Sequence, residues 1–452
     1  MKQRIFLIIA LATLSFTFIQ DFIDKALREM VVREQLAPIQ KPANIDPDKV
    51  ELGRLLFFDK LLSGNKDISC ATCHHPSFNS GDSLVLSIGV GGTGLGGSRQ
   101  MGKNRHRIPR NSPEIFNRGA KEWHTMFWDG RVALAGNGKL DTPAEEKLPQ
   151  GLDNVLAAQA MFPVTSRDEM RGRIGDQDVN GQPNKLALIS NAAPQSVWKA
   201  IMARVLEHEE YRNLFTKVYP DIPLEKLGFQ HAANAIAAFE AEAFTFVNSP
   251  WDRYLSGQEE AISKSAKRGA LLFFGAAQCS SCHSGNLMTD QEFHNIGAPQ
   301  FGPGKGNGRP YDYGRYAETG QPENRFAFRT PPLRNVALTG PWMHNGAYFT
   351  LEEVIGHHLN PTEYLRNYDP SQLEDELQAT YHGDEKTVEM ILETLDPKLP
   401  KSSVLDEGGI ADIISFLESL TDSSLLRLDH LVPERVPSGL AVDERSVRRA
   451  GY

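Results

Sequence analysis

All four cysteines of the chain lie in two short motifs, in each of which a histidine directly follows the second cysteine. The motifs are Cys70-Ala-Thr-Cys73-His74 and Cys279-Ser-Ser-Cys282-His283. Two thiols at this spacing can each add to a vinyl group of one haem, and the adjacent histidine then reaches the iron as an axial ligand. The motifs therefore predict two covalently bound haem c groups.

Two other kinds of site could use the same residues, namely a zinc site or a pair of redox-active dithiols. Structural zinc takes four ligands around one ion. The two motifs lie in different halves of the 452-residue chain, so only folding could bring them together. Covalent haem is attached outside the cytoplasm, so the haem interpretation also predicts an exported protein.

The start of the chain fits export. Lys2 and Arg4 precede an apolar run from Ile5 to Ile19, which is shorter than the roughly 20 residues that a membrane-spanning helix needs. A basic start with a short apolar centre is typical of a secretory signal, although no clear small-residue cleavage site follows. We expect residues 1–20 to be a signal peptide, with an uncleaved N-terminal anchor or a buried helix as alternatives.

Composition and charge exclude several classes of protein. Hydrophobic residues make up 40% and charged residues 23% of the chain, as in globular proteins and unlike disordered or polytopic membrane proteins. The 48 basic and 57 acidic residues leave a formal charge of −9. No overall basic field exists to bind nucleic acid, so we expect no nucleic-acid partner. The length predicts about two to three domains.

A sequence repeat precedes the two cysteine motifs. Residues 51–58 read Glu-Leu-Gly-Arg-Leu-Leu-Phe-Phe and residues 267–274 read Lys-Arg-Gly-Ala-Leu-Leu-Phe-Phe, both with apolar residues at helical spacing. A helix followed by a haem motif, present twice, predicts two similar domains. Gly53 and Gly269 match within the repeat, and each either weakens its helix or lets another helix cross closely. Convincing strand patterns are absent, so we expect an all-α fold with long loops.

Further motifs follow each cysteine motif in a fixed order. After the first come Arg110-Asn-Ser-Pro113, Phe127-Trp-Asp-Gly-Arg131, Gln159-Ala-Met-Phe-Pro163 and Glu169-Met170. After the second come Thr330-Pro-Pro-Leu-Arg-Asn335, Thr339-Gly-Pro-Trp-Met-His-Asn-Gly346 and Thr350-Leu-Glu-Glu353. With these motifs in this order and spacing, the chain resembles the bacterial di-haem cytochrome c peroxidases and their MauG-like relatives over roughly residues 45–422.

The resemblance implies an all-α protein of two cytochrome c-like haem domains with a calcium ion between them. Residues 45–250 would form the N-terminal domain, whose haem reacts with peroxide. Residues 255–422 would form the C-terminal domain, whose haem receives electrons. Residues 423–452 look like a polar tail. The resemblance also implies a periplasmic location and allows a homodimer.

Motif matching gives the positions of the calcium ligands and of an aromatic bridge. Asn111, Thr339 and Pro341 fall at the calcium positions of the family, where amide and carbonyl oxygens suit a hard cation. Trp128 matches a tryptophan that the family keeps between the haems, where an indole shortens the gap that an electron must cross. From the sequence alone, Asn111 would be a turn residue and Trp128 a core residue beside Phe127.

Gln159 and Glu169 keep the spacing that the family has around its peroxide site. Cleaving peroxide requires a proton to move from one of its oxygens to the other, which a nearby carboxylate can do. An amide can orient the peroxide or a water molecule. The resemblance therefore makes Glu169 the acid–base group and Gln159 its polar partner, whereas Glu169 alone would read as a solvated helix charge.

The sequence departs from the family in two places. Many members hold a second histidine over the peroxidatic haem, but the matching loop, residues 87–97, contains none, and His106 lies nearby out of register. We therefore expect the first haem to be open on one side. Where the classical peroxidases have a methionine ligand and MauG-like enzymes a tyrosine, this chain has His358, with His357 beside it.

We expect His283 and His358 to be the two axial ligands of the second haem. Two imidazoles stabilise ferric iron more than a histidine and a methionine do, so the reduction potential should be lower. The alternatives are a pair of surface histidines at 357 and 358, or Met343 or Met390 as a ligand. His75, beside the first axial histidine, is expected at the surface.

Three functions are compatible with these residues. The first is an exported peroxidase that reduces hydrogen peroxide to water with electrons from a cytochrome c or similar donor. The second is a MauG-like oxidase that modifies side chains of a partner protein. The third is a simple electron carrier, which the predicted roles of Gln159 and Glu169 disfavour. His358 in place of tyrosine speaks against close kinship with MauG.

Overall fold

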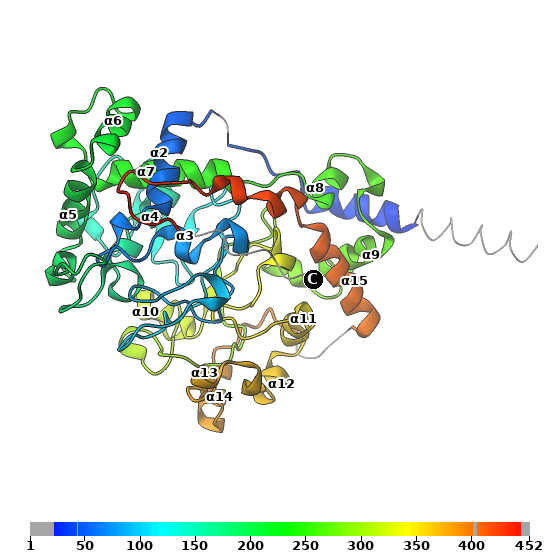
Figure 1. Ribbon diagram of the computed structural model, residues 1–452. Helices are drawn as coiled ribbons and strands as arrows, with labels where there is room; N and C mark the ends of the chain where they lie inside the picture. Colours follow the sequence, from blue (N-terminus) through cyan, green and yellow to red (C-terminus); the bar gives the residue numbers. More distant parts are fainter. Residues whose placement is uncertain (1–21, 43, 401–404, 444–452) are drawn as a thin grey trace, which may run out of the picture.

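The computed structural model describes residues 22–42, 44–400 and 405–443 (Figure 1). The expected signal peptide, residues 1–20, lies outside the described residues. Across these ranges, no helix is both long enough and apolar enough to cross a membrane. The chain is built mainly of helices and long loops, and its strands contain only two or three residues each. The expectation of a largely helical protein is confirmed.

A helical stretch over residues 22–33 comes first in the described chain. The α-helices that follow are α2 (Pro47–Phe58), α3 (Cys70–Cys73), α4 (Val155–Ala160), α5 (Pro194–Leu206), α6 (Glu209–Val218), α7 (Phe229–Ala243), α8 (Pro250–Leu255), α9 (Lys264–Phe273), α10 (Tyr316–Thr319), α11 (Leu351–Leu359), α12 (Pro361–Arg366), α13 (Asp375–Gln378), α14 (Glu385–Leu392) and α15 (Glu407–Ser419). The strands are β1 (Thr125–Met126), β2 (Val132–Leu134), β3 (Leu140–Asp141), β4 (Phe293–His294) and β5 (Phe328–Arg329).

The first hydrophobic core is organised around the crossing of α2 and α7, with α4, α5 and α6 packed beside it. Helix α2 begins after Asp46, whose carboxylate accepts a hydrogen bond from the amide of Asp48 and satisfies a helix N-terminus. At the crossing, a Cβ atom on Gly53 would lie 1.8 Å from the carbonyl oxygen of Ala235. Only glycine lets the two helices approach this closely.

The second core repeats this arrangement with α9 and α15, beside α8 and α11 (Figure 1). A Cβ atom on Gly269 would lie 1.8 Å from the carbonyl oxygen of Asp412 in α15. The second interpretation of the repeated glycines is therefore confirmed, because both are close helix crossings. The repeated segments form α2 and α9, and each leads into a cysteine motif.

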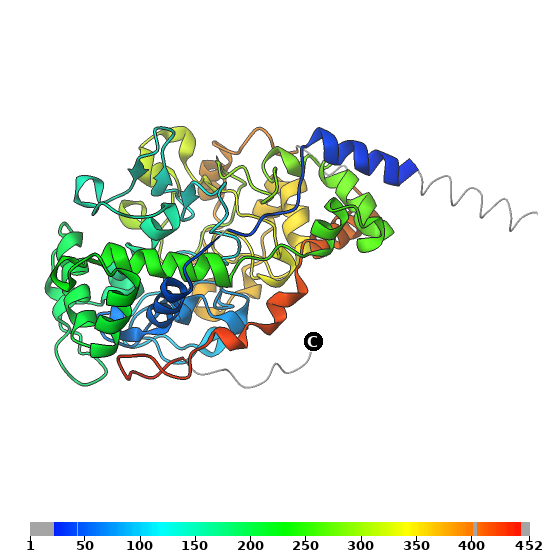
Figure 2. The same cartoon turned by 90° about the horizontal axis from the view of Figure 1, so that it is seen from above.

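Each end of the described chain packs on the core that is distant from it in sequence (Figures 1 and 2). Helical residues 22–33 bury Leu27 and Met30 in the second core, where Asp24 pairs with the buried Lys267 at 2.8 Å. Residues 423–443 run back over the first core and bury Leu425 and Val436 there. These crossed ends tie the two halves of the chain together.

Two small antiparallel sheets lie where the halves meet. In the first, β1 pairs with β2 and β2 with β3, so that residues 127–131 form the tight turn between β1 and β2. In the second, β4 pairs with β5 through Phe293 and Arg329. The amide of Arg329 donates to the carbonyl of Trp128 at 2.8 Å. The turn that carries Trp128 is therefore fixed by the backbone of the C-terminal half.

Candidate haem sites

A large cavity in the first half is lined by Cys70, Cys73 and His74. Its empty space, including open solvent at its mouth, is about 1410 Å³. The cysteines come from the one-turn helix α3, which begins after Ser69. The amide of Ser69 donates a hydrogen bond to the hydroxyl of Thr72 at 3.0 Å. The cavity therefore has the attachment residues that a covalent haem requires.

His74 has the hydrogen bonding of a metal ligand. Its Nδ1 lies 3.1 Å from the carbonyl oxygen of Ser80, and because a carbonyl only accepts, Nδ1 carries the hydrogen. Burial lowers the pKa of His74 to about 4, so the imidazole is neutral and the lone pair of Nε2 is free. Ligating histidines commonly donate their second ring N–H to a carbonyl in this way.

The polar residues expected around peroxide line the same cavity. Gln159 lies in the last turn of α4. Glu169 lies on a π-helical turn, Arg167–Arg171, that begins after Ser166. Burial raises the pKa of Glu169, and the positive charges of Arg131 and Lys305 oppose this rise. A raised pKa makes the protonated form of the carboxyl group easier to reach, as an acid–base group in proton transfer requires.

The loop over residues 87–97 packs directly on the turn that carries Glu169. The amide of Val90 donates to the carbonyl of Glu169 at 2.9 Å, and a Cβ on Gly89 would lie 1.9 Å from the carbonyl oxygen of Asp168. His106 is exposed and does not line the cavity. Among the described residues, His74 is the histidine that lines the cavity.

Trp128 lies between this cavity and the C-terminal half. The indole N–H donates to the carbonyl of Asn111 at 3.0 Å, and the ring meets His344 edge-on with centroids 6.5 Å apart. His344 is buried and stacks on Phe328 of β5. Sequence reasoning missed His344, although it lies inside the quoted motif over residues 339–346.

A small polar cavity brings together Asn111 and Thr339 from the two halves. Pro341 does not line it, although Gly340 does. Asn79 and Asp82 line it as well, and their oxygens Oδ1 and Oδ2 are buried without a hydrogen-bond partner. Burial raises the pKa of Asp82 to about 6. A set of oxygen donors with unsatisfied buried atoms suits a calcium ion.

In the second half, the rings of His283 and His358 lie close together. Their ring centroids are 6.3 Å apart. Metal–imidazole bonds are about 2 Å long, so one metal ion between two facing imidazoles would place their centroids about 6 Å apart. Nδ1 of His283 donates to the carbonyl of Met288 at 3.2 Å and Nδ1 of His358 to that of Val354 at 2.7 Å. Each Nε2 therefore keeps its lone pair.

His357 has no ring nitrogen left for a metal. Its Nε2 donates to the carbonyl of Ile296 at 2.7 Å, so its Nδ1 must accept from the hydroxyl of Tyr348 at 2.8 Å. The ring is fully buried, and burial lowers its pKa to about 3. The surface alternative for these two histidines is wrong for His357. The expectation that His75 lies at the surface is wrong too, because it is fully buried against Phe58.

Comparison with known proteins agrees with this geometry. A family model for di-haem cytochrome c peroxidase matches residues 47–260. The chain is 32% identical over 339 residues to the methylamine utilization protein MauG of Methylorubrum extorquens, covering 75% of this chain and 76% of that protein. It is 30% identical over 311 residues to the cytochrome c551 peroxidase of Pseudomonas aeruginosa, covering 69% and 71%.

Solved structures show the same relationship. A MauG-like protein associated with microbial copper homeostasis superimposes with a TM-score of 0.58 at 27% identity, covering 87% of this chain and 95% of that one. The diheme peroxidase BthA from Burkholderia thailandensis shares the fold, with a TM-score of 0.57 at 20% identity over 86% and 91% of the two chains. With its two cysteine motifs and this similarity over most of its length, the chain belongs to the di-haem cytochrome c peroxidase family, whose members include MauG.

Proposed function

We propose that this protein is an exported di-haem peroxidase that reduces hydrogen peroxide to water with electrons from a cytochrome c or a similar small donor protein. One observation carries the proposal. Gln159, Glu169 and Trp128 line the same cavity as the haem-attachment residues Cys70 and Cys73. A site that only carried electrons would not need a buried acid–base group beside the haem.

In this proposal, residues 45–250 form the peroxidatic domain and residues 255–422 the electron-transfer domain. When bound, the two haems supply the iron centres that pass electrons from the donor to peroxide. Cys70, Cys73 and His74 hold the first haem. Cys279 and Cys282 attach the second, with His283 and His358 as its axial ligands. The free Nε2 lone pairs of these three histidines support this assignment.

Glu169 moves the proton that peroxide cleavage requires. Its burial favours the protonated form, while Arg131 and Lys305 keep the ionised form accessible. The amide of Gln159 orients peroxide or water by hydrogen bonding, since it cannot exchange a proton at neutral pH. Trp128 lies on the route between the haems. Its hydrogen bonds to the backbone of both halves support that role.

Calcium binds, in this proposal, between the halves through Asn111 and Thr339, which line the small polar cavity, and through Pro341, which directly follows the lining residue Gly340. The unsatisfied oxygens of Asn79 and Asp82 support a cation at this place. The indole N–H of Trp128 donates to the carbonyl of Asn111. A cation that holds Asn111 would therefore also hold Trp128.

The second candidate function is a MauG-like oxidase acting on a partner protein. The 32% identity to a protein named MauG favours it. His358 stands where MauG-like enzymes have tyrosine, which favours the peroxidase. In both cases we place the protein in the periplasm, where haem c is attached, and a homodimer is compatible with either.

The test is turnover of hydrogen peroxide by the purified holoenzyme with a reduced small cytochrome c as electron donor. We expect donor oxidation that depends on peroxide and falls sharply in Glu169→Gln. Negligible turnover in the wild-type protein, together with oxidation of tryptophan or tyrosine side chains of a partner protein, would instead establish the MauG-like function.

A further inference from the structure

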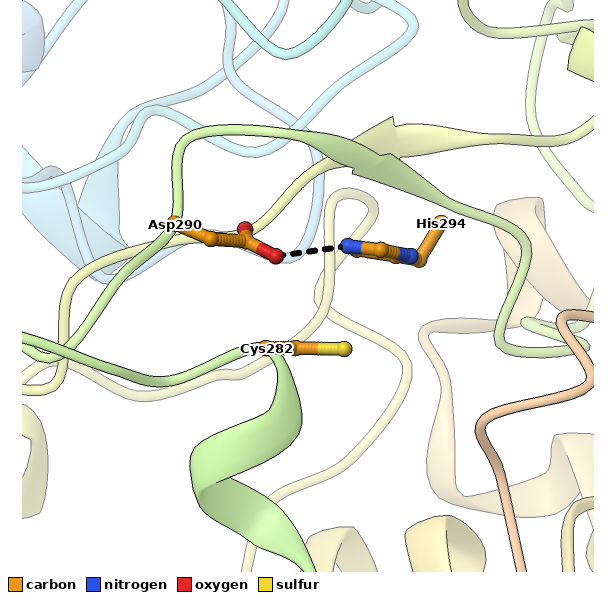
Figure 3. Close-up of side chains that lie close together, drawn as sticks. All are labelled: Cys282, Asp290 and His294. Carbon is orange, nitrogen blue, oxygen red and sulfur yellow. Dashed lines mark hydrogen bonds and ion pairs between the residues drawn. The ribbon is translucent and has the colours of Figure 1, made fainter.

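Asp290, His294 and Asp396 form a chain of contacts beside Cys282, the second attachment residue of the second haem motif. Cys282, Asp290 and His294 each place a polar or sulfur atom within 4.8 Å of the others (Figure 3). His294 bridges two carboxylates, because its Nε2 lies 2.9 Å from Asp290 Oδ2 and its Nδ1 lies 2.5 Å from Asp396 Oδ2. Asp290 and His294 lie four residues apart at β4, whereas Asp396 comes from the segment that follows α14.

This cluster is not arranged as a metal site. Zinc would need four ligands converging on one point. Both ring nitrogens of His294 are already used, and they point to carboxylates on opposite edges of the ring. The sulfur of Cys282, moreover, is the atom that a covalent haem consumes.

The hydrogen bonds fix the net charge of the cluster formed by Asp290, His294 and Asp396. A carboxylate oxygen only accepts, so each of the two contacts between His294 and a carboxylate needs a hydrogen. An imidazolium between two carboxylates satisfies this, and so does a neutral imidazole between one carboxylate and one carboxylic acid. The total charge is −1 in both cases. Lys398 lies 4.0 Å from Asp290, but its side chain is 48% exposed, so water screens it.

The cluster itself is shielded from water. The side chains of His294, Asp290 and Asp396 are 9%, 16% and 16% exposed. A negative charge in such surroundings acts over a longer distance than one in solvent. Asp290 and His294 each place an atom within 4.8 Å of the sulfur that would join the haem to the chain.

We propose that Asp290, His294 and Asp396 set the reduction potential of the second haem, by holding one net negative charge beside Cys282 that stabilises the oxidised iron. This rests on the proposed function, since it requires a haem on Cys282. The cluster would act together with the two imidazole ligands, because both lower the potential. These residues are positioning residues and do not contact the ligand atoms of the iron.

The test is a redox titration of the holoenzyme carrying Asp290→Asn and Asp396→Asn together. The absorption of the low-spin haem reports how much of it is reduced at each potential. The two asparagines can keep both hydrogen bonds to a neutral His294, so the change removes charge and leaves the shape. A unit charge at about 12 Å, with an effective dielectric of about 20, is worth about a tenfold change in an equilibrium constant. We expect reduction of this haem to become about tenfold more favourable, which is about 59 mV for one electron.

Asp178→Asn is the matched control, because Asp178 is a buried carboxylate of the first half that pairs with Lys66 at 2.8 Å. It should change the same equilibrium constant by less than twofold. If the double asparagine variant is not recovered, Asp290→Ser with Asp396→Ser removes the same charges and leaves room for water.

Other outcomes would overturn the proposal. A change below twofold with an intact low-spin spectrum would show that the cluster does not set the potential. Loss of the low-spin signal would make the two aspartates supports of the ligand set instead. One equivalent of zinc in the holoenzyme, absent from the double variant, would make the cluster a metal site. A chain without haem at Cys282 by mass would refute the proposed function, which is a separate result.

Discussion

The two adjacent histidines at 357 and 358 should respond to the same substitution in opposite ways. His358→Ala removes an imidazole whose Nε2 is free and whose ring lies close to that of His283, with centroids 6.3 Å apart. His357→Ala removes an imidazole whose two nitrogens are both hydrogen-bonded to the protein. The first change should therefore alter the haem and the second should alter stability.

The size of the stability effect follows from the contacts. Without His357, the hydroxyl of Tyr348 and the carbonyl of Ile296 lose their partners inside the protein. Each unsatisfied buried group costs about 1–3 kcal/mol, so we expect the folded state to lose about 2–6 kcal/mol. Besides the proposed bond to the haem iron, His358→Ala loses within the polypeptide the bond from Nδ1 to the carbonyl of Val354, worth about 1 kcal/mol.

The assay is the ferric absorption and electron paramagnetic resonance spectrum of each variant, with thermal unfolding measured in parallel. We predict that His358→Ala loses the bis-histidine low-spin signal and unfolds near the wild-type temperature. His357→Ala should keep that signal and unfold at a lower temperature. Loss of the low-spin signal in His357→Ala alone, or a wild-type spectrum with methionine ligation, would refute the reasoning.

Three further predictions concern the cavity, the cation and the helix crossings. Glu169→Gln should keep both haems and their ligation yet lower peroxide turnover by about 10²–10⁴-fold, the usual contribution of a general acid–base group; near-normal turnover with an intact ferric spectrum would move that role to another group. Verified removal of calcium should lower turnover and change the haem spectra. Added calcium should restore both better than magnesium, because magnesium demands tighter octahedral geometry. Unchanged spectra and turnover after removal would count against the site. Gly53→Ala and Gly269→Ala should each cost about 1–3 kcal/mol of stability through overpacking, because the added methyl would meet a carbonyl oxygen at 1.8 Å. Gly136→Ala, where a Cβ meets nothing within 4 Å, is their control and should be neutral; equal melting temperatures for all three variants would contradict the crossing argument.

Local chemistry explains what the sequence could predict. Haem attachment needs only residues that are neighbours in the chain, so Cys70, Cys73 and His74 were identified without the fold. The paired glycines were readable for a similar reason, since Gly53 and Gly269 repeat at matching places in two matching helices. The resemblance to a family then supplied Gln159 and Glu169, which the fold brings to one cavity.

Contacts between distant segments explain what the sequence could not predict. The packing of residues 22–33 on the second core, and of residues 423–443 on the first, depends on surfaces that exist only after folding. His344 and Asp82 carry no signal of their own, because a buried histidine and a turn aspartate are common. The choice between His357 and His358 depends on which face of α11 points to His283, and helical periodicity alone does not give it.

The number of covalent haems tests the central claim most directly. The intact mass of the purified protein should exceed that of its processed polypeptide by two haems. Changing Cys279 and Cys282 to alanine together should leave one, on Cys70 and Cys73. A wild-type mass equal to the bare polypeptide, or two covalent haems retained after the double change, would contradict the account.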